Sequence, residues 1–289
     1  MIIFISGASG YLGSQLVKTL SEEHQVFALM RSTSSKSRIE GVYADVIYVD
    51  ENNVLEKTFA QHQPDIVINT AALYGRKGES FSALINANID FPTQLLALTG
   101  KYNCKAFIHT GTSLPDCISP YALTKNTFVK LAQFNSDSSI KFVNVALEHF
   151  YGPDDDSSKF TSYVINACLS GDKLALTDGL QQRDFIFIDD VVAAYKVLIE
   201  NIAKLDTFET VPVGSGVAPT VRELVEMIHT CSLSKSSLEF GAVAMRENEL
   251  MYSCADICRL KQLGWQPAYS LEAGIKATLT VKWAAFNRF

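Results

Sequence analysis

Short apolar runs alternate with amphipathic segments along the first half of the chain. Each apolar run has the length of a strand buried on both faces, and the longer segments repeat their apolar residues with helical spacing. The predicted strands lie at 1–5, 26–30, 46–49, 66–68, 106–108 and 142–146, and the predicted helices at 14–20, 52–62, 80–102 and 120–136. This alternation predicts an α/β fold with a doubly wound parallel (Rossmann) sheet, whose ligand lies beyond the carboxyl ends of the strands.

Three glycines stand between the first predicted strand and the first predicted helix. Gly7, Gly10 and Gly13 have the spacing G-x-x-G-x-x-G. Glycine lets a dinucleotide pyrophosphate approach the backbone closely, and the N–H groups that open the helix then face the phosphates. The strand–turn–helix context favours dinucleotide binding over an ordinary glycine-rich turn. Further cofactor contacts are predicted in the same turn, at Ser9, Tyr11 and Leu12.

The pattern changes after residue 150. Turn residues at 151–156 precede predicted helices at 159–170, 190–203, 220–231 and from about 270, with a short strand at 185–188 and a Pro/Gly segment at 212–219. We therefore predict a dinucleotide-binding domain over 1–150, to which 184–205 return, and a smaller C-terminal substrate-binding lobe over 151–289. The two are expected to be interleaved.

Composition narrows the class of protein. The 289 residues are 47% hydrophobic and carry a net charge of −6, which argues against a nucleic acid or an anionic membrane as partner. No apolar run has the length of a membrane span, and a strand that begins at Met1 leaves no room for a signal peptide. Six scattered cysteines favour a reducing compartment, and Cys254 and Cys258 lack the further ligands that zinc requires. The sequence predicts a cytoplasmic protein without a metal.

The residues after the second strand bear on the choice of cofactor. Met30 is followed by Arg31 and Ser32, and no acidic residue appears before Glu40. An acidic residue would bind the ribose 2′-hydroxyl of NAD, whereas guanidinium and hydroxyl groups match the 2′-phosphate of NADP. NADP(H) is therefore favoured, NAD(H) stays open, and a solvated basic loop is the alternative. Asp50 either accepts from the adenine amino group or caps the helix that follows.

A second group of polar residues follows the fifth strand. Thr112 and Ser113 stand beyond the strand end, where a hydroxyl can bond a substrate carbonyl oxygen as it gains charge. Tyr121 and Lys125 are four residues apart and share one helix face. An ammonium beside a phenol lowers the pKa of the phenol, which makes it a usable acid or base. A surface Tyr–Lys pair is the alternative, but the preceding motifs favour Thr112, Tyr121 and Lys125 as catalytic residues.

These motifs resemble the extended short-chain dehydrogenase/reductase superfamily, in its nucleotide-sugar epimerase/dehydratase branch, over nearly the whole chain. The resemblance implies that Ala71 and Ala72 line the cofactor and that Asn88 supports the central helix. It implies that Phe150 and the turn Tyr151-Gly-Pro153 border the nicotinamide. The C-terminal signature Leu263-Gly-Trp-Gln-Pro267 belongs to the same branch.

The resemblance also implies a set of substrate contacts. Arg183, in the segment Arg183-Asp-Phe-Ile-Phe-Ile-Asp-Asp190, and Arg246 would bind the nucleotide diphosphate, and surface ion pairing with Asp184 or Glu247 is the alternative for them. Contacts with the sugar are expected from Tyr74, Ser113 and His149. Members of the family often dimerise through helices that correspond to 80–102 and 120–136, which implies a homodimer.

Departures from the family pattern narrow the activity. The acidic residue of NAD-dependent epimerases is replaced by Arg31, the asparagine before Tyr-Gly-Pro is replaced, and the acidic pair of dehydratases is missing after Thr112. The stretch 148–190 is similar to CDP-abequose and CDP-paratose synthases, which are NADPH-dependent reductases of a CDP-4-keto-3,6-dideoxyhexose.

The resemblance therefore implies an NADPH-dependent reductase of the C4 keto group of a nucleotide-linked 4-keto-6-deoxy or 3,6-dideoxy hexose, in deoxysugar biosynthesis for surface polysaccharide. Two alternatives stay open. The first is an NAD-dependent nucleotide-sugar 4-epimerase, and the second is a non-catalytic NADP-binding regulatory protein, which would have no need of the Tyr–Lys pair. The nucleotide of the sugar is left open.

Overall fold

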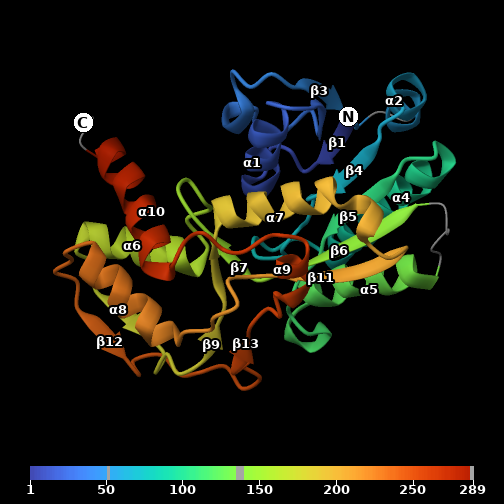
Figure 1. Cartoon of the computed structure of the whole chain (residues 1–289). Coiled ribbons are helices and arrows are strands. Elements are labelled where there is room, and N and C mark those ends of the chain that lie inside the picture. Colours follow the sequence, from blue (N-terminus) through green and yellow to red (C-terminus); the bar gives the residue numbers. More distant parts are fainter. Residues whose placement is uncertain (51–52, 135–139, 287–289) are drawn as a thin grey trace. The chain divides into compact units, whose positions relative to one another are not determined.

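The computed structural model describes residues 1–50, 53–134 and 140–286 (Figure 1). Contacts within the chain divide it into two compact units. The first unit comprises Met1–Leu147 and Ala194–Val211, and the second comprises Glu148–Ala193 and Pro212–Phe289. None of the helices in the described ranges combines the length and the hydropathy needed to cross a bilayer.

A seven-stranded sheet with the order β11-β6-β5-β4-β1-β2-β3 organises the fold. Its strands are β1 (Ile2–Ser6), β2 (Gln25–Met30), β3 (Asp45–Tyr48), β4 (Ile66–Asn69), β5 (Ala106–Thr110), β6 (Lys141–Leu147) and β11 (Phe208–Val213). β1 pairs in parallel with both β2 and β4, so that Ile3 lies between Val26 and Ile66. The predicted α/β fold with a doubly wound parallel sheet is confirmed.

Helices cover both faces of this sheet. They are α1 (Tyr11–Leu20), α2 (Val54–His62), α3 (Phe81–Ile85), α4 (Phe91–Lys101), α5 (Pro120–Phe134) and α7 (Ile188–Glu200). The chain moves from β1 to β2 in one direction along the sheet and from β4 to β5 in the other. Right-handed crossovers therefore place α1 and α4 on opposite faces.

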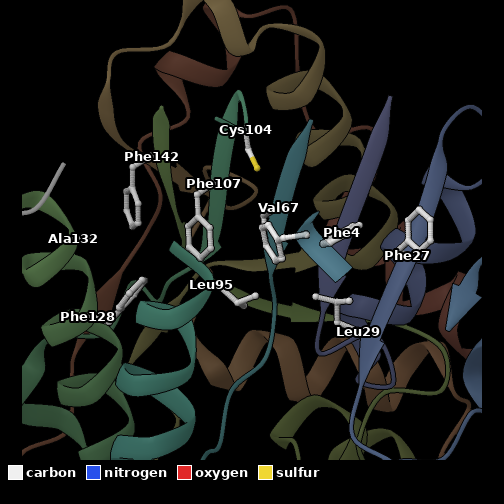
Figure 2. Packing of buried hydrophobic residues seen from close by; sticks show 11 residues of the cluster. Phe4, Phe27, Leu29, Val67, Leu95, Cys104, Phe107, Phe128, Ala132 and Phe142 are labelled. Carbon is white, nitrogen blue, oxygen red and sulfur yellow. The ribbon is translucent and has the colours of Figure 1, made fainter. Parts of the chain in front are cut away.

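A cluster of aromatic side chains fills the face that α4 and α5 cover. Phe4, Phe107 and Phe142 point from three strands toward Leu95 of α4 and Phe128 of α5 (Figure 2). The ring centroids of Phe107 and Phe142 are 5.8 Å apart, and those of Phe107 and Phe128 are 6.3 Å apart. Burial of side chains of this size contributes about 1.5–3 kcal/mol each to folding, so this layer stabilises the packing of α4 and α5 against the sheet.

The predicted helix at 80–102 is interrupted. A π-helical turn, η2 (Asn86–Asp90), separates α3 from α4. Asn88 lies in this turn, is fully buried, and uses its side chain to hold the backbone of Leu73 through both its N–H and its C=O, at 2.9 and 3.0 Å. The π-helical turn contains one residue more than a regular α-helical turn. It therefore directs the Asn88 side chain toward the loop that follows β4.

The second unit is built from helices and short strand pairs. Its helices are α6 (Phe160–Ser170), α8 (Val221–Cys231), α9 (Cys258–Gln262) and α10 (Leu271–Phe286), and the paired strands are β7 (His149–Tyr151) with β10 (Phe185–Phe187), β8 (Leu174–Leu176) with β12 (Leu238–Phe240), and β9 (Gln182–Arg183) with β13 (Tyr252–Ser253). Asp190 anchors the C-terminal segment, because its carboxylate accepts from the backbone N–H groups of Ala268 and Tyr269.

The first two residues of the Pro/Gly segment at 212–219 belong to a strand. β11 continues through Pro212 to Val213 and forms one edge of the large sheet. Proline is tolerated there because an edge strand leaves one side of its backbone without a ladder partner. The short pairs of the second unit have two or three residues per strand, which is too few for a hydrophobic alternation to show in the sequence.

The close packing of α1 generates a prediction about stability. A Cβ atom added to Gly13 would lie 2.2 Å from the carbonyl oxygen of Gly7, whereas one added to Gly100 of α4 meets no described atom within 4 Å. Gly13→Ala is expected to lower the free energy of unfolding by about 1–3 kcal/mol, through backbone displacement. Gly100→Ala is the matched control and is expected to raise it by up to about 1 kcal/mol. Urea titration of both variants measures the difference, and equal midpoints would contradict the packing argument.

Candidate active site

The turn between β1 and α1 lies against the chain segment that follows β4. Gly7 has a φ of +71°, and a Cβ atom there would lie 2.5 Å from the backbone nitrogen of Ala71. Together with the contact at Gly13, this shows that two of the three glycines are required by the packing of the protein itself. At Gly10 an added Cβ atom meets a single neighbour, the Gly7 carbonyl oxygen at 3.1 Å. Of the three, Gly10 is therefore the position where close approach of a ligand explains glycine best.

The start of α1 suits a pyrophosphate. The helix begins at Tyr11. Its N-cap residue is Gly10, which has no side chain to accept from the N–H groups of the first turn. The first N–H groups of a helix have no intrahelical acceptor, so an anion can accept from them. Tyr11 and Leu12 are buried, Ser9 and Ala71 are half-buried, and the predicted contact residue Ala72 is half-buried in the same loop.

The loop after β2 carries the predicted determinants of cofactor choice. Arg31 and Ser32 are both exposed, and the backbone N–H of Ser32 donates to the carboxylate of Asp50. Asp50 does not cap a helix, because α2 begins at Val54 and its N-cap residue is Asn53. The cap interpretation of Asp50 is therefore wrong, and the carboxylate instead ties the ends of β2 and β3 together. Residues 51–52, where the predicted helix was expected to begin, lie outside the described residues.

Lys125 is a buried amine on α5. Its side chain is 1% exposed, and its Nζ atom has no hydrogen-bond partner among the described residues. Burial lowers the pKa of this amine to about 7. A buried donor without an acceptor is costly, so the position fits a group that brings acceptors, such as the ribose hydroxyls of a dinucleotide. The residues present therefore fit the predicted cofactor.

Tyr121 lies one turn before Lys125 on the same helix, but the expected effect of the lysine on it is wrong. Burial raises the pKa of Tyr121 well above its usual value, and Lys125 is not among the groups that shift it. The positive charge of Lys125 instead lowers the pKa of His109 on β5. A shared helix face fixes where two side chains begin, whereas their rotamers decide which neighbours they meet.

The Tyr121 phenol is covered by a residue of the loop that follows β4. The rings of Tyr74 and Tyr121 are stacked, with centroids 4.6 Å apart and an interplanar angle of 24°. The guanidinium of Arg76 lies 5.1 Å from the centroid of the Tyr74 ring. The structure therefore brings the predicted substrate residue Tyr74 directly to the predicted catalytic tyrosine.

The predicted catalytic hydroxyls lie in the loop after β5. The Oγ1 atom of Thr112 accepts from the backbone N–H of Leu114 at 3.3 Å, and the N–H of Ser113 donates to the Leu147 carbonyl at 3.2 Å. Both side chains are half-buried. The backbone of this loop is thus held to the end of β6, and the Thr112 hydroxyl hydrogen stays available to donate.

A chain of buried polar residues, which no sequence motif predicted, crosses the ends of three central strands. The hydroxyl of Ser6 donates to the Asn69 side chain at 2.5 Å, and the Asn69 amide nitrogen lies 3.0 Å from Nδ1 of His109. All three residues are fully buried and stand opposite one another in the register of β1, β4 and β5. Burial and the Lys125 charge hold the pKa of His109 well below its usual value, so the imidazole is neutral. Aligned strand ends could have shown this pattern.

Arg183 and Arg246 stand in different surroundings within the second unit. Arg183 is buried, and its guanidinium donates to Glu249 at 2.7 Å and to the carbonyls of Gln182 and Leu250. Neither of the two acids considered from the sequence, Asp184 and Glu247, is a described partner of this guanidinium. Arg246 is exposed, and no described contact joins it to Arg183.

The carboxylate of Asp184 has its own partners. It accepts from the backbone N–H groups of Ser215, Gly216 and Ala255 at 2.7, 2.9 and 3.2 Å. Asp184 is fully buried, so these N–H groups replace the water that the carboxylate loses. The residue thus fixes the loop after β11 to the segment after β13.

His149 has an acidic neighbour that the sequence analysis passed over. Its Nδ1 atom lies 3.6 Å from the carboxylate of Glu148, which is buried and accepts from the Ser253 hydroxyl at 2.6 Å. The next residue, Phe150, has the ammonium of Lys159 at 3.5 Å from its ring centroid. Glu148 stands beside the position where the family usually has asparagine, and that departure is the signal that could have found it.

Known proteins of the same family match nearly the whole chain. Residues 3–214 match the model of the NAD dependent epimerase/dehydratase family. CDP-abequose synthase from Salmonella typhimurium is 32% identical over 292 residues, which cover 96% of this chain and 97% of the relative. GDP-L-fucose synthase from Escherichia coli is 25% identical and covers 96% of this chain and 94% of the relative.

Solved structures share the fold. UDP-glucose 4-epimerase from Thermotoga maritima, in complex with UDP-glucose, superimposes with a TM-score of 0.87 at 23% identity, covering 99% of this chain and 100% of that one. UDP-glucuronic acid 4-epimerase from Bacillus cereus, in complex with UDP-glucuronic acid and NAD, gives a TM-score of 0.86 at 23% identity with the same coverage. Because the family model spans most of the sequence, the chain belongs to the NAD dependent epimerase/dehydratase family and is an NAD(P)-dependent enzyme of its nucleotide-sugar branch.

Proposed function

We propose that the chain reduces the C4 keto group of a nucleotide-linked 4-keto-6-deoxy or 3,6-dideoxy hexose with NADPH, in deoxysugar biosynthesis for surface polysaccharide. The observation that carries this proposal is the pair of Tyr121 and Lys125 on α5, where the phenol, whose pKa burial raises, carries a proton at neutral pH and the amine one turn later is buried. A ketone reductase needs an acid at this position. Similarity to CDP-abequose synthases over most of the chain, at 27–32% identity, supports the substrate class.

In this mechanism the residues of the first unit handle the proton and the developing charge. NADPH, when bound, supplies the hydride. Tyr121 donates its phenolic proton to the carbonyl oxygen as that oxygen gains negative charge, and the Thr112 hydroxyl donates a hydrogen bond to the same oxygen. Lys125 holds the ribose of the cofactor through its buried amine. Hydride and proton together convert the ketone to an alcohol, so the step is balanced.

The preference for NADP is supported by the loop after β2. Arg31 is exposed at the end of the strand, where the 2′ position of the adenosine ribose lies in dinucleotide sites. Ser32 adds a hydroxyl, and its backbone is fixed by Asp50. A guanidinium held by such a loop matches a phosphate dianion better than an uncharged hydroxyl.

Substrate contacts in the second unit are also part of the proposal. Arg183 and Arg246 would bind the diphosphate, and His149 would contact the sugar, as would Ser113 of the first unit. The guanidinium of Arg183 is held by the buried ion pair with Glu249, and a diphosphate would take the place of that carboxylate. The exposed Arg246 would approach the diphosphate as a mobile cation.

A homodimer is proposed through the helices that cover one face of the sheet. Four large apolar side chains of α3 and α5 are exposed, namely Phe81, Leu123, Leu131 and Phe134, the last at 93%. Exposed apolar groups gathered on neighbouring helices are typical of a protein interface.

All six cysteines carry free thiols, which supports the proposed cytoplasmic location.

The reductase function predicts a specific cofactor assay. The purified chain is offered NADPH or NADH with CDP- and dTDP-linked 4-keto-6-deoxy and 4-keto-3,6-dideoxy sugars, and oxidation is followed by absorbance. We expect NADPH to be oxidised faster than NADH, and Tyr121→Phe to lose roughly 10²–10⁴-fold in turnover while it still binds cofactor. Tyr43→Phe, at an exposed tyrosine, is the control.

Two outcomes of this assay would contradict the reductase function. If no ketosugar is reduced and NAD⁺ co-purifies with the chain, the 4-epimerase replaces it. If the chain binds cofactor but shows no turnover that Tyr121→Phe could remove, the non-catalytic regulatory protein replaces the reductase as the proposed function.

The role of Arg31 predicts a selective loss of affinity. Arg31→Ala removes a charge-assisted contact to the 2′-phosphate, which is expected to weaken NADPH binding by about 10–100-fold and to leave NADH binding unchanged. Lys57→Ala, at an exposed cation of α2, controls for net charge. Fluorescence titration with both cofactors measures the ratio, and an equal loss for NADPH and NADH would show that Arg31 is a solvated surface charge.

The lowered pKa of Lys125 predicts a pH dependence of cofactor binding. In the free chain the amine is neutral above a pH of about 7. Ribose hydroxyls that accept from the ammonium raise that pKa, so binding takes up a proton, and the affinity for NADPH should fall by up to about tenfold per pH unit above 7. Lys125→Met should bind more weakly and with a flat profile. Titrations between pH 6 and 9 test this, and parallel profiles for both proteins would exclude the amine.

A further inference from the structure

We propose that Tyr74 positions the Tyr121 phenol and returns a proton to it from solvent after each turnover, with Arg76 stabilising the negative charge that Tyr74 carries in transit. This inference rests on the proposed function, because it takes Tyr121 as the acid. It assigns Tyr74 to proton supply, as a positioning residue that acts through Tyr121.

The geometry connects the half-buried phenol of Tyr121 to a more exposed one. Tyr74 is hydrogen-bonded to Tyr121 and its ring is stacked on it at 4.6 Å, while the Tyr74 side chain itself is 40% exposed. Tyr121 is half-buried and is less exposed than Tyr74, and desolvation by its surroundings raises its pKa. Tyr74 therefore gives it an ionisable neighbour that reaches water.

The chain holds Tyr74 in this place from both sides. The preceding residue, Leu73, is fixed by Asn88 through two backbone hydrogen bonds, and the same Asn88 side chain donates to Thr124 of α5 at 2.9 Å. The following residue, Gly75, has a φ of +71°, a conformation that glycine adopts without strain. This turn brings the guanidinium of Arg76 over the Tyr74 ring, 5.1 Å from its centroid.

Several groups set the acidity of Tyr121. Tyr74 raises the pKa of the phenol through its hydrogen bond and its own charge, Tyr195 of α7 raises it slightly, and Arg76 lowers it. The charge of Lys125, also on α5, lowers the pKa of His109 on β5, in addition to the larger effect of burial. Arg76 is thus the cation whose charge opposes the effect of burial on the pKa of this phenol.

The proton transfers balance. Tyr121 gives its proton to the alkoxide and becomes a phenolate, and Tyr74 then transfers its own phenolic proton to that oxygen. The charge now lies on Tyr74, where the guanidinium of Arg76 faces the ring and stabilises it. Tyr74 takes a proton from water at its exposed edge. The net proton of the reduction comes from solvent, and no further reactant is required.

Transient kinetics separate this relay from a structural role. Tyr74→Phe keeps the stacked ring and removes the hydroxyl. Its first turnover uses the proton already on Tyr121, so we expect a burst of one equivalent of NADPH oxidised per site, followed by a steady rate about tenfold or more below wild type. The KM for the ketosugar should stay within about twofold. Tyr102→Phe, a tyrosine with Lys101 at 5.7 Å from its ring centroid, is the matched control and should show no burst.

Two kinetic results would overturn the relay. A steady rate for Tyr74→Phe within twofold of wild type would show that the hydroxyl is dispensable. An equal slowing of the first and later turnovers would show that Tyr74 affects the chemical step alone.

A measurement without substrate separates this inference from the proposed function. Tyrosines labelled with ¹³C at the carbon bonded to oxygen are followed between pH 7 and 11, with Tyr121 assigned by its loss in Tyr121→Phe. The Tyr121 resonance should begin to shift at lower pH in Tyr74→Phe and at higher pH in Arg76→Met, following the directions given above. Identical curves in both variants would overturn the coupling, whether or not any ketosugar is reduced.

Discussion

The contact between the β1–α1 turn and the segment after β4 is the constraint on which the site depends. Gly7 and Ala71 approach so closely that a Cβ atom on Gly7 would lie 2.5 Å from the Ala71 nitrogen. The adjacent strand ends are joined by the Ser6 hydroxyl and the Asn69 side chain. This contact fixes the start of α1 and the loop that leads to Tyr74 in one rigid arrangement. It lies at the point where the strand order reverses, where a doubly wound sheet binds its ligand.

Burial, more than pairing with opposite charges, sets the acid–base character of the first unit. Lys125, Tyr121 and His109 each lose hydration, and for all three the neutral form is favoured. A neutral tyrosine can donate a proton, and the Nδ1 atom of a neutral imidazole can accept from the Asn69 amide. Desolvation of the three groups costs stability, and the aromatic layer around Phe107 and Phe128 contributes burial energy that offsets it.

The sequence predicted what local patterns encode, and it missed what depends on side-chain direction. Apolar runs and glycine spacing predicted the strands and the tight turn between β1 and α1, because both follow from backbone geometry. The spacing placed Tyr121 and Lys125 one turn apart on α5, but the lysine charge acts on His109, which is 16 positions earlier, and the tyrosine ring stacks on Tyr74. Likewise the partner of Arg183 is Glu249, which is 66 residues away. Such pairs are set by the packing of distant segments, which a single sequence does not reveal.

The ion pair of Arg183 bears on how a diphosphate could bind there. A guanidinium that is already neutralised by Glu249 and bonded to two carbonyls gains little from one more acceptor unless a partner leaves. If a phosphate oxygen takes the place of Glu249, the guanidinium keeps one anionic partner. The net free energy of the exchange is then set by hydration of the released carboxylate. Glu249 is better exposed than Arg183, at 22% against 7% of the side chain, which makes it the partner that water can recover. Binding at Arg183 would therefore proceed by replacement of one anion with another.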